Sequence, residues 1–296
     1  REVGLIYFVL TAAGYLVYRL AGMGWLDALV HIMSTVSTGG FSSHGASIGH
    51  YRSVLPAVAT LPFMLLGAVS FSTLLRVRRG RFKALLRDRE LYVLLGLVVL
   101  VTVLSLLPAG TGGELLASLF QGLSAATTTG FSVVPYGEQS ALARLLTAAL
   151  MVLGGSSGST AGGIKLIRVI LLVQLMRWCI VTIMLPREAR FPIQSAGRVM
   201  AGRELNLNFS LFGMYVLWLM ITTIAISAAG FDPLDAFYES ASALGTVGLS
   251  SGITGGSLAP GLKVLLALNM WAGRLEIVAV MLFFYPSAWI ERRRTR

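Results

Sequence analysis

The chain has 296 residues, of which 55% are hydrophobic and only 12% are charged, and its mean hydropathy is +0.77. This composition excludes an ordinary soluble globule, because the apolar surface exceeds what one core can bury, and it is typical of a membrane protein. The net charge of +11 suits either a nucleic-acid or a lipid partner, and the positions of the charges decide between them.

Uncharged apolar runs long enough to cross a hydrocarbon core of about 30 Å recur along the whole chain. They cover residues 54–75, 91–107 and 209–229, with a shorter run over 4–18 and a last run over 264–289 that contains two charges. The single cysteine, Cys179, has no partner for a disulfide framework or a thiolate metal cluster. The sequence therefore predicts an all-α polytopic membrane protein.

The basic residues gather in three segments. Seven of the 24 Lys and Arg residues lie in 76–90, seven more in 165–203, and four in the last six residues. The positive-inside rule places these segments in the cytoplasm. The connectors that then face outside lie near residues 42–53, 110–118, 132–141, 230–238 and 250–262. We interpret the basic loops as topology signals and contacts with the lipid bilayer, and we predict no nucleic-acid partner.

One unit is repeated three times along the chain. Its copies are residues 28–45 ("ALVHIMSTVSTGGFSSHG"), 115–134 ("LLASLFQGLSAATTTGFSVV") and 235–252 ("DAFYESASALGTVGLSSG"). Each copy is a short amphipathic helix that ends in hydroxyl-bearing residues, followed by Gly, a large apolar residue and Ser. The aligned triplets are Gly40-Phe41-Ser42, Gly130-Phe131-Ser132 and Gly248-Leu249-Ser250. Because a membrane helix flanks every copy on both sides, the unit reads helix, half-helix, loop, helix, and all three half-helices enter from outside.

The loops that follow the half-helices are predicted to line an enclosed path, because irregular backbone at membrane depth must be buried in protein or face water. The half-helices point their C-terminal ends, each with about half a negative charge, toward one region, which favours a cation. Thr or Val followed by Gly allows an extended strand whose carbonyl oxygens replace an ion's hydration shell, and "TVG" at 246–248 matches the start of the potassium-channel filter. Close helix packing through small residues is the alternative interpretation.

A second irregular stretch, "LGGSSGSTAGGIK" over residues 153–165, interrupts the membrane span that begins near Leu145. So many Gly, Ser and Thr residues cannot hold a stable helix in mid-span. A phosphate-binding loop is the interpretation that a soluble protein would suggest. Here Ile164 separates the last glycine from Lys165, and no strand precedes the segment, so nucleotide binding is not predicted.

Four segments together resemble the Trk/Ktr/HKT superfamily of potassium and sodium transporters, and within it the bacterial TrkH/TrkG type. They are residues 34–49 ("STVSTGGFSSHGASIG"), 127–131 ("TTTGF"), 154–168 ("GGSSGSTAGGIKLIR") and 269–276 ("NMWAGRLE"). The resemblance covers essentially the whole chain. It implies repeated units of helix, pore half-helix, filter loop and helix around a central pore.

Members of this family are built from four repeats, and the resemblance implies that this sequence holds only the last three. The implied units are residues 1–79, 80–185, which contains an intramembrane gating loop, and 186–296; the first repeat is absent. Because the chain also opens directly on an apolar helix, we expect it to be a fragment.

The resemblance implies an ion-binding filter made of backbone carbonyls from all three loops. Its residues are Thr38, Gly39, Gly40, Thr128, Thr129, Gly130, Thr246, Val247 and Gly248. Leu249 and Ser250 follow where a tetrameric potassium channel has Tyr and Gly. The ordered stack of carbonyls should therefore be short, in keeping with the looser selectivity of the family.

The resemblance also implies a gate below the filter. It consists of the mobile intramembrane loop Gly154, Gly155, Ser156, Ser157, Gly158, Ser159, Thr160, Ala161, Gly162 and Gly163, together with Arg274. A charge ten residues into the last span costs about 2.5 to 3.5 kcal/mol, so Arg274 should face the protein interior with a partner. The family places it against the gating loop, where it adds a barrier to cations; a structural arginine bonded to loop carbonyls is the alternative.

Other side chains offer little chemistry. Acidic residues at the outer starts of the half-helices are predicted to cap them: Asp27, Glu114, Asp232 and Asp235. No metal site other than K⁺ or Na⁺ at the filter is predicted. His31 lies in a half-helix, where we expect it to pack or to bond to the backbone, and His44 and His50 lie in an outer loop without acidic neighbours at metal-ligand spacing.

We therefore expect a non-enzymatic pore that conducts potassium, with no cofactor beyond the permeant ion. The resemblance adds a bacterial inner-membrane location, a homodimer and a cytosolic nucleotide-binding regulatory subunit of the TrkA type. A sodium-preferring or non-selective transporter of the same family stays open as an alternative. So do a secondary transporter, which inverted rather than parallel repeats would favour, and a non-conducting membrane assembly subunit.

Overall fold

The computed structural model describes residues 2–51, 53–107, 115–184, 194–195, 198–199, 202–256, 258–275 and 277–285. The basic segment predicted at the end of the chain lies outside these residues. Within them the regular secondary structure is helical apart from one short antiparallel hairpin of β1 (Gln194–Ser195) and β2 (Arg198–Val199). The prediction of an all-α fold is confirmed.

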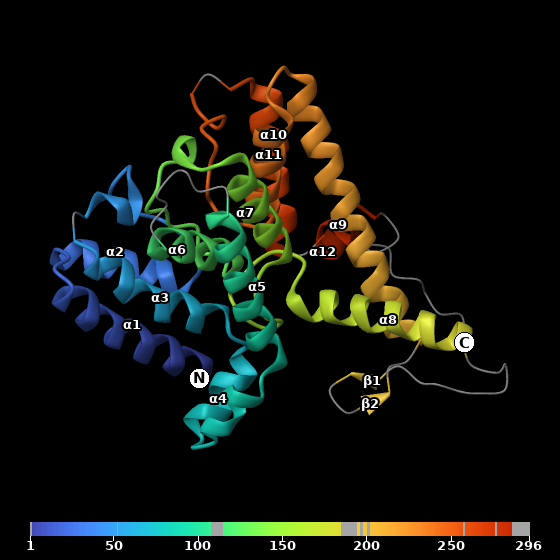
Figure 1. Ribbon diagram of the computed structural model, residues 1–296, viewed down its shortest axis with the longest axis horizontal. Coiled ribbons are helices and arrows are strands. Elements are labelled where there is room, and N and C mark those ends of the chain that lie inside the picture. The colour runs from blue at the N-terminus through green and yellow to red at the C-terminus, as the bar shows by residue number, and fades with distance from the viewer. Residues whose placement is uncertain are drawn as a thin grey trace, which may run out of the picture.

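One arrangement of helices occurs three times: a long helix, a short helix, an irregular loop and a second helix (Figure 1). The three sets are α1 (Glu2–Leu20), α2 (Trp25–Val36) and α3 (Leu55–Ala68); α5 (Arg89–Leu106), α6 (Leu115–Ala126) and α7 (Ala141–Leu153); and α9 (Gly202–Ala228), α10 (Pro233–Leu244) and α11 (Pro260–Leu275). The other helical elements are α4 (Phe71–Arg78), α8 (Leu166–Met184), α12 (Ile277–Phe284) and the short 3-10 helices η1 (Ser47–His50), η2 (Phe82–Arg87) and η3 (Tyr136–Glu138).

Four helices of the described chain are long and apolar enough to cross a membrane, namely α1, α5, α8 and α9. Together α3 and α4 form a fifth such segment, but they bend by 104° at the break between them. The predicted continuous run over 54–75 is therefore wrong as one straight helix. The span α8 was missed by the sequence reading because two arginines, Arg168 and Arg177, interrupt its apolar run.

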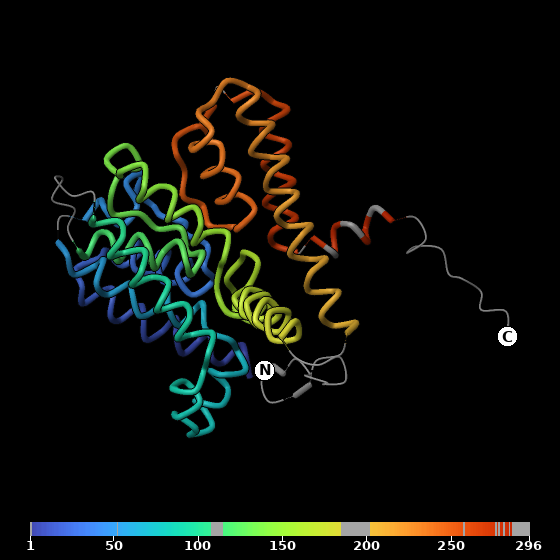
Figure 2. Tube along the Cα trace, turned by 45° about the vertical axis from the view of Figure 1, so that its right-hand side comes forward, coloured from blue at the N-terminus to red at the C-terminus, as the bar shows by residue number. Residues whose placement is uncertain are grey.

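The short helices are the most buried elements. All residues of α6 from 120 to 126 are buried, as are residues 238–244 of α10. The long helices instead expose large apolar side chains, such as Phe8 on α1 and Ile224 on α9. Because apolar residues on the outside of a spanning helix face lipid, the fold surrounds three half-helices with membrane-facing ones. Figure 2 shows the first two sets side by side, with α9 and α11 standing beside them.

Candidate functional site

The three loops that follow the half-helices lie against one another. A methyl group on Gly40 would sit closer than 3.0 Å to the carbonyl oxygen of Thr129, and one on Gly130 would sit closer still to that of Val247. Glycine alone permits such an approach of one backbone to the next. The loops are therefore stacked in chain order, with the glycines of the first and second loops facing the backbone of the next loop.

All three loops adopt the same unusual backbone conformation. The first residue has a positive φ in each copy, 51° at Thr38 and 53° at both Thr128 and Thr246. The third residue, always glycine, is also at positive φ: Gly40, Gly130 and Gly248. A β-branched residue in this region is an outlier that costs on the order of 1–3 kcal/mol. The simple extended strand expected from the sequence is therefore wrong, because the first and third residues of each loop have positive φ values, which a β-strand does not adopt.

The positive φ of each threonine follows from how its half-helix ends. The amide of the second loop residue donates to the carbonyl five residues earlier in every copy: Gly39 to Ser34 at 2.7 Å, Thr129 to Ser124 at 2.9 Å, and Val247 to Ser242 at 2.9 Å. This is the bonding pattern of a helix that terminates on a left-handed residue. The half-helix and its loop are thus one unit, which directs the negative end of the helix dipole at the loop.

A polar side chain stands at the same position of all three half-helices, nine residues before the loop glycine. These residues are His31, Gln121 and Glu239, and each is at most 6% exposed. His31 Nε2 lies 2.9 Å from the hydroxyl of Ser42, two residues after the loop glycine. The Glu239 carboxylate accepts hydrogen bonds from the equivalent Ser250 hydroxyl at 2.5 Å and from the Ser251 amide at 2.8 Å.

The first and third loops are therefore tied back to their own half-helices by His31 and Glu239. The prediction that His31 packs or bonds to the backbone is confirmed, since the residue is buried and its Nδ1 lies 2.7 Å from the Asp27 carbonyl oxygen. Its contact with Ser42 was not predicted, and neither was any role for Glu239. Their chemical types differ, so only counting back from the aligned glycines would have found the shared position. In the second copy Ser132 donates to Val134 instead, at 2.7 Å.

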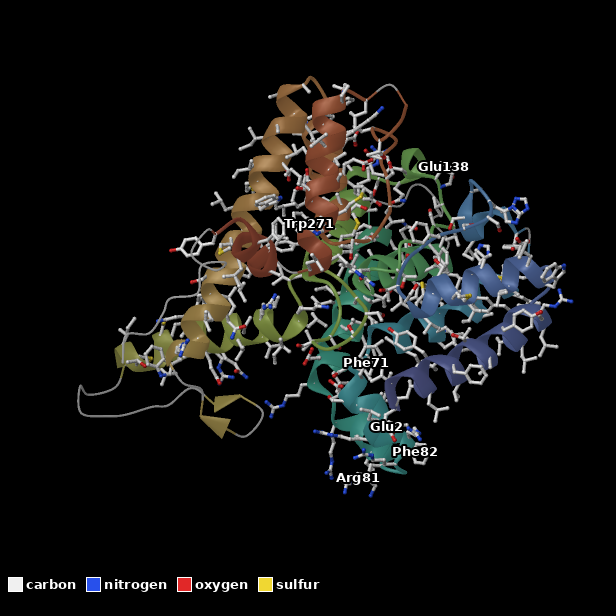
Figure 3. All side chains as sticks on the ribbon, turned by 180° about the vertical axis from the view of Figure 1, so that it is seen from behind. Glu2, Phe71, Arg81, Phe82, Glu138 and Trp271 are labelled. Atoms are coloured by element: carbon white, nitrogen blue, oxygen red, sulfur yellow. The ribbon has the colours of Figure 1, made fainter. Side chains whose placement is uncertain are left out.

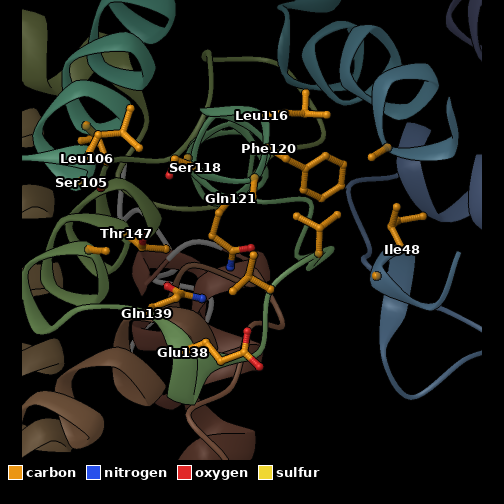
Figure 4. A pocket seen from close by; sticks show the side chains of 18 of the residues that line it. Ile48, Ser105, Leu106, Leu116, Ser118, Phe120, Gln121, Glu138, Gln139 and Thr147 are labelled. Carbon is orange, nitrogen blue, oxygen red and sulfur yellow. The ribbon is translucent and has the colours of Figure 1, made fainter. Parts of the chain in front are cut away.

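Gln121, at the equivalent position of the second copy, points into a cavity of about 480 Å³ (Figure 4). Figure 4 shows its carboxamide beside Gln139 and Thr147. The Gln121 side-chain oxygen has no hydrogen-bond partner among the described residues. The second loop thus has no tie from this position, and it is joined to its half-helix by the Ser124 hydroxyl, which donates to the Phe131 carbonyl at 2.6 Å.

The Gly- and Ser-rich loop after α7, residues 154–163, lies against all three of these loops. The Gly162 amide donates to the Thr128 hydroxyl at 2.7 Å, and the Thr38 hydroxyl donates to the Thr160 carbonyl at 2.9 Å. A methyl group on Gly162 would clash with the carbonyl of Gly245, directly before the third loop. This loop, which we call the intramembrane loop, thus joins three segments that are distant in sequence.

The intramembrane loop also fills the break between α3 and α4. The Ser156 amide donates to the Ala68 carbonyl at 3.1 Å, and the Phe71 amide donates to the Gly158 carbonyl at 2.9 Å. The Thr160 hydroxyl donates to the Gly67 carbonyl at 2.9 Å. Because buried peptide groups need partners, these bonds allow a spanning helix to stop in mid-course.

Arg274 lies near the C-terminal end of α11 and contacts the intramembrane loop. Its Nη1 donates to the Thr160 carbonyl oxygen at 3.2 Å. Thr160 is therefore bonded to the first loop, to α3 and to α11 at once, which makes it the most connected residue of the intramembrane loop.

The acidic residues at the outer ends behave differently from one another. Asp232 caps α10 by accepting from the amides of Leu234 and Asp235, as predicted. The prediction for Asp27 is wrong, since α2 has no side-chain cap and the carboxylate accepts from the Ser43 hydroxyl at 2.6 Å. That hydrogen bond holds the pKa of Asp27 below its usual value. Asp235 accepts from the Tyr136 hydroxyl, and Glu114 lies outside the described residues.

Comparison with known proteins places these features in a family. A family model described as "TrkH: Cation transport protein" matches residues 3–110 and 97–293. The chain is 31% identical to the Trk system potassium uptake protein TrkH of Escherichia coli K12, over 98% of this chain and 62% of that protein. It is 34% identical to the protein of the same description from Halomonas elongata, over 96% of this chain and 61% of that protein.

A solved structure is similar as well. The crystal structure of the potassium transporter TrkH from Vibrio parahaemolyticus matches with a TM-score of 0.88 and 29% identity, over 97% of this chain and 64% of that one. The chain thus spans about 60% of the length of the curated relatives that it matches.

Proposed function

Because this chain belongs to the TrkH family of cation transport proteins, we propose that its three loops line a path by which potassium ions cross the bacterial inner membrane. The observation that carries this proposal is one strained backbone conformation, repeated in three loops that pack directly against one another. Carbonyl oxygens fixed at the ends of three half-helices offer a cation ligands that replace its hydration shell. The names of the relatives favour potassium over sodium as the ion.

The filter of the proposed path is made of the nine loop residues named from the sequence. Each of these residues lies at or next to a loop position that contacts either the backbone of a neighbouring loop or the intramembrane loop. These nine residues come from three repeated units, and we propose the boundaries 1–79, 80–185 and 186–296 for the units.

A fourth unit outside this chain is proposed to complete the ring. A methyl group on Gly248 would meet no atom within 4 Å in the described structure, unlike one on the equivalent glycines. Phe41 is 76% exposed, whereas its counterparts Phe131 and Leu249 are 0% and 5% exposed. Both open surfaces belong to the first and third loops, where a fourth loop would close the circle.

The intramembrane loop is proposed to gate the path, with Arg274 holding it through Thr160. Opening then requires the loop to leave the three filter loops and the break after α3. We further propose that the protein works as a homodimer, and that a cytosolic nucleotide-binding subunit of the TrkA type acts on the gate from the basic face.

The test is cation flux into proteoliposomes that hold the protein together with its upstream repeat. Uptake is measured for potassium, rubidium, sodium and lithium, alongside Gly248→Ser and a deletion of residues 156–161. Potassium and rubidium flux that loses selectivity in the first variant and becomes constitutive in the second supports both filter and gate. Preference for sodium would favour the alternative ion. No flux from a folded, dimeric protein would refute the pore and leave a role in membrane assembly.

A milder prediction concerns the hydroxyl of Thr160. Thr160→Val keeps the shape of the side chain but removes the donor to Gly67, and it leaves that buried carbonyl without a partner at a cost of about 1–3 kcal/mol. Basal potassium flux without the regulatory subunit should rise by about fivefold or more, since a cost of about 1 kcal/mol is roughly a factor of five. The control is Thr223→Val, whose hydroxyl bonds only within α9. Equal flux from both variants would show that Thr160 does not hold the gate closed.

A further inference from the structure

A basic cavity of about 960 Å³ opens at the end of the molecule opposite the η3 side. Its walls are α4, η2, the start of α5 and one face of α8. Five cationic side chains line it: Arg76, Arg81, Lys83, Arg87 and Arg89. Figure 3 shows Arg81 and Phe82 at this end, near Glu2 and far from Glu138.

The charge of the basic cavity is not neutralised from within. Its two carboxylates offset only part of the charge of the five cations. Asp88 accepts from the Thr73 hydroxyl and from the Glu90 amide, and Glu90 accepts from the Ser157 amide. Among the described residues, the ion pair formed by this basic segment is that of Arg78 with Glu2, and Arg78 does not line the cavity. An anion entering here would find an excess of cations together with the hydroxyls of Ser70 and Ser72.

The rim of the basic cavity is apolar. Phe82 and Leu86 of η2 are 71% and 67% exposed, although they alternate with the basic residues. Ile167 and Ile170 of α8 line the opposite wall. Cations beside exposed apolar side chains match a ligand with an anionic head and hydrocarbon chains, rather than a free anion.

We propose that the basic cavity binds the headgroup of an anionic phospholipid from the cytoplasmic leaflet, with the acyl chains against η2 and α8. The inference rests on the cytoplasmic orientation of residues 76–90 that the proposed function assumes. It does not require that the chain conducts ions.

The same walls hold the intramembrane loop. Phe71, next to the cavity residues Ser70 and Ser72, donates its amide to Gly158, and Glu90 accepts the amide of Ser157. A bound phosphate would therefore lie beside both anchors of the loop on this face. Flux through the protein should depend on the content of anionic lipid in the bilayer.

The experiment measures lipid retention by native mass spectrometry, using the full protein and either phosphatidylglycerol or phosphatidylcholine. Arg81→Gln with Arg87→Gln removes two cavity charges. The matched control, Arg78→Gln with Arg79→Gln, removes two charges from the same segment outside the cavity. We expect preferential retention of phosphatidylglycerol that falls by about tenfold or more in the first pair and little in the control.

Several outcomes would overturn the proposal. Equal losses in both pairs would mean diffuse attraction to an anionic membrane without a site. Full displacement by glycerol phosphate would assign the cavity to a free anion. Unchanged lipid binding with loss of a cytosolic partner would make it a protein-docking face. Retention without any flux would instead leave the lipid site standing and refute only the proposed function.

Discussion

Gly130→Ala should reduce potassium flux by at least about 100-fold while the protein still reaches the membrane. The new methyl group would overlap the Val247 carbonyl oxygen. No rotamer change can relieve this clash, because the backbone fixes the position of the methyl group and the carbonyl oxygen is itself a backbone atom. The residue also sits at a φ of 88°, where an L side chain is strained. Relief requires the second and third loops to separate, which displaces carbonyls of both. Rubidium uptake into proteoliposomes measures the loss.

The matched control for this variant is Gly230→Ala. Gly230 has a φ of 96° in the turn before α10, and a methyl group there meets nothing within 4 Å in the described structure. It therefore carries the same backbone strain without the clash, and it should retain most of the flux. If Gly130→Ala conducted as well as Gly230→Ala, the close packing of the loops would have no part in transport.

The second large effect is expected at Glu239. Glu239→Leu deprives the Ser250 hydroxyl and the Ser251 amide of their acceptor, and each lost hydrogen bond contributes about 0.5–1.5 kcal/mol. The third loop then loses its tie to α10, and its carbonyls can adapt to a smaller ion. The ratio of potassium to sodium flux should fall by about tenfold. The ratio is informative because a general loss of folding would lower both fluxes together.

Two further variants identify the cause. Glu239→Gln keeps an oxygen that accepts the same hydrogen bonds, so it should restore most of the selectivity. Gln121→Leu removes the equivalent side chain of the second copy, whose oxygen has no partner among the described residues, and should change the ratio little. Loss of selectivity in Gln121→Leu equal to that in Glu239→Leu would point to packing rather than to the tie.

The repeats and their half-helices were predictable because their signals are local. The Gly-apolar-Ser triplet recurs after each short helix, and α2, α6 and α10 each end two residues before the threonine that begins the loop, at Val36, Ala126 and Leu244. The break after Ala68 was not predictable in the same way. Residues 54–75 are uniformly apolar and carry no stop signal, and the bonds that stabilise the break come from residues about 90 positions further along the chain.

The site shows the same division. The nine positions proposed for the filter follow from the alignment of the three repeats and from the family resemblance, but the positive φ of the three threonines does not, since β-branched residues normally avoid that region. The shared position of His31, Gln121 and Glu239 is visible only as a spacing, because the three side chains have nothing chemical in common beyond polarity. The hydrogen-bond partners of His31 and Glu239 come from the loop that follows each half-helix.

The break between α3 and α4 has a mechanical consequence. In an unbroken helix the Phe71 amide would bond to the Gly67 carbonyl, and the Ala68 carbonyl would accept from the amide of Ser72. Three of these four groups are instead bonded to the intramembrane loop: the Phe71 amide to Gly158, the Gly67 carbonyl to Thr160 and the Ala68 carbonyl to Ser156. Withdrawal of the loop and straightening of α3 into α4 are therefore an exchange of partners rather than a loss of bonds. Under the proposed gating, a straight helix running from α3 into α4 would become accessible only after the intramembrane loop has left.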